Sequence, residues 1–115
     1  GSEGREEATG RGVVSVTDAL FRRLNRPLSG ATVALQGFGN VGSYAAQFLV
    51  EKGAKVVGVT DMSGGVWNPE GLDIPGLLAH AKQKGTVAGC PGTDALTNEQ
   101  LFASEVDILI PAALG

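Results

Sequence analysis

The sequence predicts an α/β protein with a doubly wound, mostly parallel β-sheet, and three observations support this prediction. Short apolar runs of β-branched residues alternate along the chain with longer segments of helical periodicity, which is the pattern of strands joined by crossover helices. A glycine-rich turn follows the first of these runs and opens the next helical segment. The length of 115 residues fits one modest domain, and an apolar content of 43% is enough for a core.

The predicted helices have apolar residues at helical spacing and residues typical of helix ends. They are expected at residues 13–24, 41–52 and 74–84, with a further short helix that begins at Thr97. Asp73 precedes the third helix as an N-cap, and Gly85 follows it as a stop. Thr97 and Gln100 have the spacing of a capping box.

The predicted strands are short apolar runs bounded by turn residues. They are expected at about 32–36, 55–60 and 106–110, with a short extended piece at 63–68 and a loop at 86–95. The first run is apolar enough to be buried on both faces, so we expect it to be the central strand, with the second strand on one side and the last on the other. The sequence therefore predicts about three main strands plus a short edge strand, with flanking helices.

The charge and the cysteine content exclude several classes of partner. A net charge of −3 and the lack of a basic stripe argue against nucleic acid. The longest apolar runs are too short to span a membrane, and no signal-peptide pattern opens the chain. Cys90 is the single cysteine, so it forms no intramolecular disulfide, and it has no metal-ligand companion at useful spacing. We therefore expect a cytoplasmic protein without a nucleic-acid, membrane or metal partner.

Gly37, Gly39 and Gly42 form a G-x-G-x-x-G motif between the first predicted strand and the next helix. Backbone N–H groups at such a helix N-terminus can bind a pyrophosphate. Gly37 would allow the tight turn, Gly39 the close approach of a phosphate, and Gly42 the packing of the helix on the strand. The alternative is a glycine-rich turn without a ligand, because a chain with 18 glycines produces such spacings by chance. The strand and helix around the motif favour a Rossmann-like dinucleotide site.

Asp61 ends the second predicted strand, about 20 residues after the glycine motif. From this position a carboxylate accepts hydrogen bonds from the hydroxyls of the adenosine ribose. No arginine or lysine lies between Lys55 and Lys82 to bind a 2′-phosphate, and the Asp61 carboxylate would repel one. The sequence therefore favours NAD as the cofactor over NADP.

Four segments together resemble one enzyme family. They are GREEATGRGV (4–13), GFGNVGSYAA (37–46), VTDMSGGVWNPEGLD (59–73) and DILIPAAL (107–114). In this order and spacing they resemble the coenzyme-binding domain of a glutamate dehydrogenase, in the Glu/Leu/Phe/Val amino-acid dehydrogenase family. The resemblance covers nearly the whole chain. It implies oxidative deamination of L-glutamate to 2-oxoglutarate and ammonia, with hydride transfer to NAD.

The resemblance also implies roles for individual residues. Thr9 is similar to a threonine near the nicotinamide carboxamide. Asn40 and Val41 resemble residues whose backbone amides meet the pyrophosphate. Ala112 and Ala113 resemble small residues that let the nicotinamide ribose lie against the sheet.

Two further residues belong to the expected site. Phe38 lies within the glycine motif and is included among the cofactor-binding residues. Arg5 resembles an arginine at the mouth of the family's cleft, where it would meet the substrate, and the alternative is a surface charge. No catalytic residue is expected in this chain, because the family's substrate-binding lysines and aspartate belong to a separate domain that we do not recognise here.

The chain is therefore expected to be a partial NAD-binding domain at 1–115, with a leading helix and turn at 1–30 and a βαβαβ core at 31–115. Gly115 stands where the family continues with Glu-Asn, so we expect the chain to stop within the domain. The isolated chain would then be inactive. The alternatives are a non-catalytic or engineered dinucleotide-binding half-domain and an assembly piece with a vestigial site. The unpaired edge of the strand at 106–110 predicts self-association.

Three remaining residues have ordinary structural explanations. His80 is expected on the surface of the third helix, and Cys90 is expected to be an inert loop thiol. Trp67 is expected to pack beside the second strand, with a contact to adenine as the alternative. The four lysines are expected to be solvated.

Overall fold

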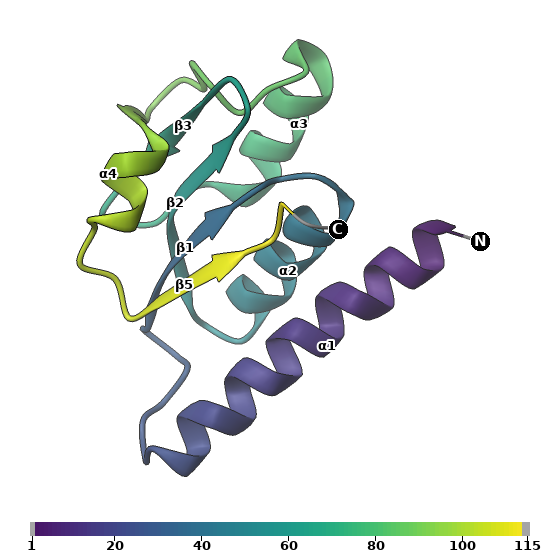
Figure 1. The fold of residues 1–115 in the computed structure, drawn as a ribbon, viewed down its shortest axis with the longest axis vertical. Coiled ribbons are helices and arrows are strands. Elements are labelled where there is room, and N and C mark those ends of the chain that lie inside the picture. Colours follow the sequence, from purple (N-terminus) through teal and green to yellow (C-terminus); the bar gives the residue numbers. More distant parts are fainter. Residues whose placement is uncertain (1, 114–115) are drawn as a thin grey trace.

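The computed structural model describes residues 2–113 of the chain. Figure 1 shows its elements in chain order: α1 (Ser2–Arg23), β1 (Thr32–Gln36), α2 (Asn40–Glu51), β2 (Lys55–Asp61), β3 (Gly64–Trp67), α3 (Ile74–Lys84), β4 (Asp94–Leu96), α4 (Asn98–Phe102) and β5 (Ile108–Pro111). Gly115, at which the resemblance predicts an interruption of the domain, lies outside the described residues.

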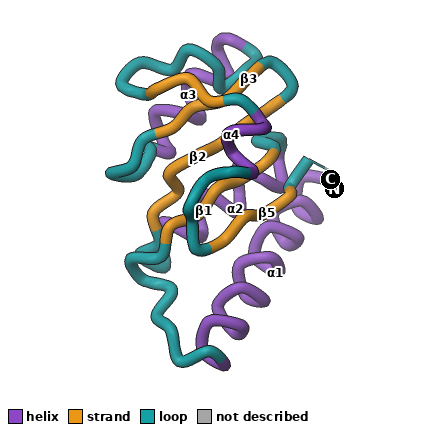
Figure 2. Tube along the Cα trace, turned by 60° about the vertical axis from the view of Figure 1, so that its left-hand side comes forward, coloured by secondary structure: helices purple, strands orange, loops and turns teal. Residues whose placement is uncertain are grey.

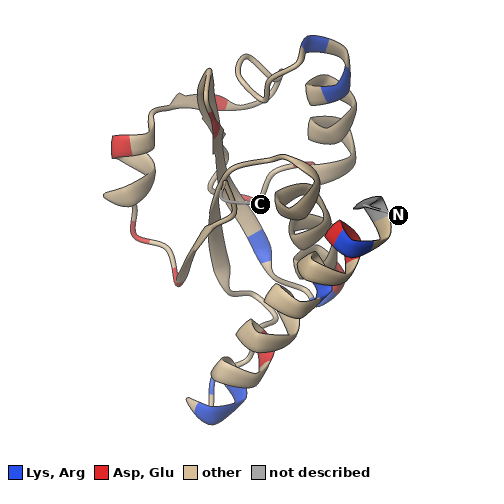
Figure 3. Ribbon diagram, turned by 45° about the vertical axis from the view of Figure 1, so that its right-hand side comes forward, with Lys and Arg blue, Asp and Glu red and all other residues tan. Residues whose placement is uncertain are grey.

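The strands form one sheet in the order β4-β3-β2-β1-β5. β1 is parallel to β2 and to β5, whereas β3 and β4 extend the sheet as antiparallel strands beyond β2. Figure 3 shows the sheet with α1, α2 and α3 on one side and α4 on the other. The predicted α/β class, the central first strand and the flanking positions of the other two main strands are confirmed.

The first helix is longer than the sequence predicts, because it begins at Ser2 rather than near residue 13. Its first half contains glycines, which normally disfavour a helix. Gly10 is buried against α2, where an added Cβ would lie 2.8 Å from the Cβ of Tyr44. Close packing on α2 therefore stabilises a helical conformation in this segment, although its residues have low helix propensity. Figures 1 and 2 show α1 beside α2, far from the β3 end of the sheet.

The predicted loop at 86–95 is wrong at its end, because β4 pairs with β3 there. β4 is only three residues long and has no alternation that would mark a strand in the sequence. Its pairing with Val66 and Trp67 is a long-range contact, so only the folded chain reveals it. The extended piece predicted at 63–68 is the strand β3.

The predicted helix boundaries at α3 and α4 are confirmed. The Asp73 carboxylate accepts a hydrogen bond from the Gly76 amide at 3.3 Å, and Gly85 ends α3 with a φ of 78°. Thr97 and Gln100 form both hydrogen bonds of a capping box at α4. These local signals fix where helices begin and end, because they satisfy backbone groups that the helix itself leaves unpaired.

The core lies between the sheet and the helices α1–α3. The central β1 contributes Val33 and Leu35, which are fully buried in the same cluster as Ala45 and Leu49 of α2, and Ala34 is fully buried on the opposite face. Burial of β1 on both faces explains its continuous apolar run. The carboxyl end of this rigid strand carries the glycine motif.

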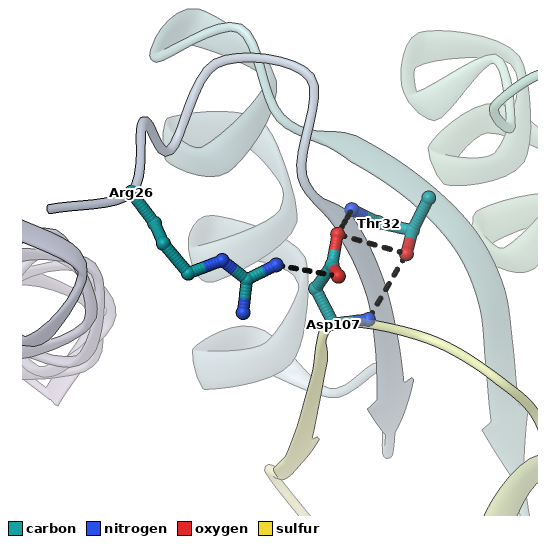
Figure 4. A network of polar contacts seen from close by, with 3 residues as sticks. All are labelled: Arg26, Thr32 and Asp107. Atoms are coloured by element: carbon teal, nitrogen blue, oxygen red, sulfur yellow. Dashed lines mark hydrogen bonds and ion pairs between the residues drawn. The ribbon is translucent and has the colours of Figure 1, made fainter. Parts of the chain in front are cut away.

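Asp107 fixes the opposite, amino end of β5 beside β1 (Figure 4). Its carboxylate accepts hydrogen bonds from the Thr32 amide at 2.9 Å, the Thr32 hydroxyl at 3.3 Å and the Arg26 guanidinium at 2.8 Å. The bond from the Thr32 amide, followed by that from Arg26, holds the pKa of Asp107 below its ordinary value. The network joins the segment after α1 to the first residues of both strands.

The residues expected to be inert lie outside the glycine motif. Trp67 packs over Gly58 of β2, as predicted. His80 is half-buried rather than exposed, because its Nε2 lies 2.9 Å from the carbonyl oxygen of Ala88. Burial and the nearby Asp73 charge raise the pKa of the half-buried Cys90 thiol, so it is a poor nucleophile. All four lysines are exposed.

Within residues 2–113, no helix combines the length and apolarity needed to cross a membrane. Over the same residues, no group of three or more His, Cys, Asp or Glu side chains could hold a metal ion. The described acidic and basic side chains form four ion pairs at the surface, three of which involve arginine.

Candidate dinucleotide site

The glycine motif lies where the carboxyl ends of β1, β2 and β5 meet the N-terminus of α2. Because β1 has β2 on one side and β5 on the other, this is the point where the strand order reverses, and ligands of open α/β sheets bind at such points. A hollow of about 270 Å³ opens here. It is lined by Gln36, Gly37, Phe38, Gly39, Thr60, Asp61, Met62, Asn98 and Ala113.

The three motif glycines differ in their surroundings. Gly37 has a φ of 110°, and a Cβ on it would lie 2.7 Å from the amide nitrogen of Ala113. A Cβ on Gly42 would collide with the carbonyl oxygen of Gly37. Gly39 has a φ of −73° and no atom within 4 Å of an added Cβ. The backbone therefore requires Gly37 and Gly42, whereas Gly39 leaves open space in the hollow.

Among the described residues, no side chain caps the N-terminus of α2. Its N-cap is Gly39, no side chain accepts a hydrogen bond from the first turn, and that turn contains no acidic residue. α3 and α4 are different, because Asp73 and Thr97 cap them. The first N–H groups of α2, with the positive end of its dipole, are thus left to bind an anion.

Two smaller hollows adjoin the first one. A hollow of about 210 Å³ lies between α1 and the α2 N-terminus, and one of about 180 Å³ lies between α1 and β5. Residues that line the first are Glu6, Gly39, Asn40, Val41, Ala112 and Ala113. Residues that line the second are Thr9, Val13, Val41, Ala45, Ile110, Pro111 and Ala112. The shared residues make the three hollows one continuous surface from Asp61 to Thr9.

The structure brings together all the predicted cofactor-binding residues but not Arg5. Thr9 is exposed on α1, and its hydroxyl donates to the Arg5 carbonyl at 2.8 Å, which leaves the oxygen free to accept. The Arg5 side chain is exposed and lines none of the three hollows. The two roles predicted for Arg5, a contact with substrate and a surface charge, both stay predictions.

Asp61 lines the largest of the three hollows and also holds a neighbouring loop. Its carboxylate accepts hydrogen bonds from the Ser63 amide at 2.9 Å, the Thr86 hydroxyl at 2.8 Å and the Val87 amide at 2.7 Å. Sequence reasoning missed this role, because Thr86 and Val87 are distant in the chain and carry no local signal. Two ionised oxygens have about four acceptor sites, so capacity for a further donor remains.

Three other residues of the site were missed by the sequence analysis. Thr60 is fully buried, and its hydroxyl donates to Asn98 Oδ1 at 2.6 Å, which ties α4 to the end of β2. Glu6 reaches the middle hollow from α1. A helix assignment that extended to residue 6 would have placed Glu6 near Thr9, one turn away.

The charges of the site are negative. Asp61 and Glu6 are the charged side chains that line the three hollows, and no described lysine or arginine joins them. Phosphate groups would therefore be held by backbone N–H groups rather than by cations. An extra phosphate beside Asp61 would meet a negative charge.

Comparisons with known proteins agree with this geometry. The glutamate dehydrogenase of Thermotoga maritima and the NADP-specific glutamate dehydrogenase A1 of Halobacterium salinarum are each 50% identical to this chain over 115 residues, which are 99% of this chain and 28% of the relative. The chain thus spans about a quarter of the length of these curated relatives.

A solved structure shows the same arrangement. The hetero-hexameric glutamate dehydrogenase of Thermus thermophilus, in a leucine-bound form, superposes with a TM-score of 0.84 at 36% identity, over 94% of this chain and 25% of that one. The family model described as Glutamate/Leucine/Phenylalanine/Valine dehydrogenase matches residues 1–115. With this match over its whole length, the chain belongs to the glutamate/leucine/phenylalanine/valine dehydrogenase family.

Proposed function

We propose that this chain binds a nicotinamide dinucleotide and forms the coenzyme-binding part of an enzyme that deaminates L-glutamate to 2-oxoglutarate and ammonia. The single observation that carries the proposal is the uncapped N-terminus of α2 beside open space at Gly39. A diphosphate fits this place, because first-turn N–H groups supply the donors that its oxygens accept. Membership in the dehydrogenase family supports the rest of the assignment.

The proposed ligand extends along the three hollows. Gly39, Asn40 and Val41 would hold its pyrophosphate, and Asp61 would hold its adenosine ribose. The nicotinamide half lies over Ala112 and toward Thr9. When bound, the dinucleotide would supply the hydride acceptor, and this chain's residues would bind and orient it.

NAD is the proposed cofactor in preference to NADP. The Asp61 carboxylate would repel a 2′-phosphate, and none of the residues that line this hollow is a cation. A relative at 50% identity is named as NADP-specific, so the preference needs a direct measurement. Titration of the chain with NADH and NADPH decides it, and equal affinities would contradict the role assigned to Asp61.

The proposal assigns catalysis to a substrate domain outside this chain. Residues 1–30 would be a leading helix and turn, residues 31–115 the dinucleotide-binding core, and the isolated chain inactive. The length of the relatives supports this division between a dinucleotide-binding chain and a separate substrate domain, since the chain matches about a quarter of their length. The free thiol of Cys90 is compatible with the reducing cytoplasm, which we propose as its location.

Calorimetry of the chain with NADH and with ADP-ribose tests the proposed function. Saturable binding of both ligands is expected, without turnover of glutamate or any other amino acid. Such binding alone also fits the alternative of a non-catalytic dinucleotide-binding half-domain. The sequence of the parent reading frame would distinguish the two functions, because only the enzyme requires a substrate domain. Failure of both ligands to bind would overturn the proposal in favour of a vestigial site.

Self-association through the edge strand β5 is the second part of the proposal. β5 pairs only with β1 in the described sheet, and an unpaired strand edge can pair with another chain. Ile108 packs against the core, so Leu109, which is half-buried, is the better position for a blocking lysine. Sedimentation should show dimers of the unmodified chain and monomers of the Leu109→Lys variant. A monomeric unmodified chain at high micromolar concentration would refute this part.

A further inference from the structure

One carboxylate at the site has no partner in the described fold. The Oε2 atom of Glu6 is buried, yet no described residue is within hydrogen-bond distance of it. Its side chain lines the middle hollow together with Gly39, Asn40 and Ala112. A buried acceptor without a donor is uncommon, because the group has lost its water without gaining a partner. Such an atom marks a place where a donor from outside the chain fits.

Two acidic side chains further along α1, Glu7 and Asp18, are paired, which distinguishes them from Glu6. Glu7, the next residue, pairs with Arg11 at 3.3 Å, and Asp18 pairs with Arg22 at 3.2 Å. These pairs lie on a different flank of the helix from Glu6, since positions three or four residues apart share a face. The fold thus neutralises the acids of one flank and leaves Glu6 turned to the hollow.

The chemistry of the hollow restricts the donor. This inference rests on the proposed function, in which the α2 N-terminus holds the pyrophosphate. Phosphate oxygens only accept hydrogen bonds and would be repelled by Glu6, whereas ribose hydroxyls donate them. The small residues Ala112 and Ala113 border the same hollow and leave room for a sugar.

We propose that Glu6 binds a hydroxyl of the second ribose, the one attached to nicotinamide, through its Oε2 atom. Glu6 and Asp61 would then hold the two sugars of the dinucleotide from two adjoining hollows, and α2 would hold the diphosphate between them. The two carboxylates differ in one respect. Asp61 already accepts donors of its own chain, whereas Glu6 Oε2 has none and depends on the ligand.

The test compares two ligands that differ by this sugar. ADP contains the diphosphate without a second ribose, and ADP-ribose contains it. Calorimetry of the Glu6→Ala variant should show ADP-ribose binding weakened about tenfold, the scale of one hydrogen bond to a charged group, and ADP binding unchanged. Glu6→Gln should retain part of the affinity, because its amide oxygen still accepts. Glu7→Ala is the matched control, since it removes the same charge from the adjacent position and should leave both affinities unchanged.

The other outcomes each overturn the proposal in a recognisable way. Tighter ADP binding by Glu6→Ala would mean that Glu6 repels the diphosphate. An effect on NADH but not on ADP-ribose would mean that the nicotinamide carboxamide is the donor. Unchanged affinities for both ligands would leave Glu6 without a role in binding. Failure of the unmodified chain to bind ADP and ADP-ribose would overturn the proposed function together with this inference.

Discussion

The two ends of the sheet use polar groups in opposite ways. At the amino end, Asp107, Thr32 and Arg26 satisfy one another. The Asp107 carboxylate accepts three hydrogen bonds from Thr32 and Arg26, and the Asp107 amide donates to the hydroxyl and the carbonyl of Thr32. At the carboxyl end, the α2 N-terminus is uncapped and Glu6 Oε2 has no described partner. The first arrangement stabilises the fold, and the second leaves free energy to be gained by binding a ligand.

This difference explains why similar residue types behave differently along the chain. Asp107 and Asp61 both lie at strand ends, and both accept hydrogen bonds from residues distant in sequence. Only Asp61 also lines a hollow. A polar residue is therefore a candidate for ligand binding when it lies beside a hollow and the fold leaves some of its hydrogen-bonding groups without a partner. Substitutions at the amino end of the sheet should therefore change stability, and substitutions at the carboxyl end should change ligand binding.

The largest difference between an effect on binding and an effect on stability is expected for substitutions of two glycines in the same motif. Gly39→Val should abolish dinucleotide binding, by about 100-fold or more, because its side chain would fill the space beside the α2 N–H groups, with helical content unchanged. Gly42→Val should instead destabilise the fold by on the order of 3 kcal/mol, because its Cβ collides with the Gly37 carbonyl. Calorimetry and thermal unfolding of both variants measure this. Equal loss of fold and binding in Gly39→Val would show that Gly39 is structural.

The amino-end network should affect stability alone. Asp107→Ala removes the acceptor of Thr32 and Arg26 and should lower the free energy of unfolding by about 1 kcal/mol, a value reduced by the partial exposure of the pair. NADH affinity should stay within twofold of the unmodified chain, since Asp107 lies at the far end of β5 from Ala112. Urea unfolding and calorimetry check the two values. A large loss of affinity at unchanged stability would refute the division between the two ends.

Cofactor preference should respond to Asp61. Asp61→Ser should narrow the ratio of NADH to NADPH affinity by about tenfold, because removing a like charge near the surface is on the order of 1 kcal/mol. The substitution also loosens the loop at Thr86 and Val87, so Asp61→Asn, whose oxygen still accepts, serves as the control for that loss. A ratio that does not change in either variant would exclude Asp61 as the determinant of preference.

The smallest expected effect is a decrease in the free energy of unfolding at acidic pH. Because the pKa of Asp107 is lower in the folded chain than its ordinary value of 3.8, its contribution is full above that value and is lost as the pH falls through the folded pKa. The free energy of unfolding of the unmodified chain should therefore fall more steeply below about pH 4 than that of Asp107→Asn. Urea titrations at pH 6 and pH 3 measure the difference. Parallel decreases would show that other carboxylates dominate.

The sequence alone determined the strand order around β1, the caps of α3 and α4 and the position of the glycine motif. Each leaves a signal in a short stretch of sequence: a strand buried on both faces is a continuous apolar run, and capping side chains satisfy neighbouring backbone groups. The motif Gly37, Gly39 and Gly42 also indicated the place of the candidate site, since the positive φ of Gly37 requires glycine locally.

Only the tertiary structure decided the features that join distant segments. The first half of α1 is helical because Gly10 packs closely on Tyr44, and β4 is a strand because β3 pairs with it. The bonds of Asp61 to the loop after α3 and the unpartnered Oε2 of Glu6 also depend on residues far apart in the chain. A sequence records the donors and acceptors that a chain contains. Folding decides which of them pair with one another and which remain for a ligand.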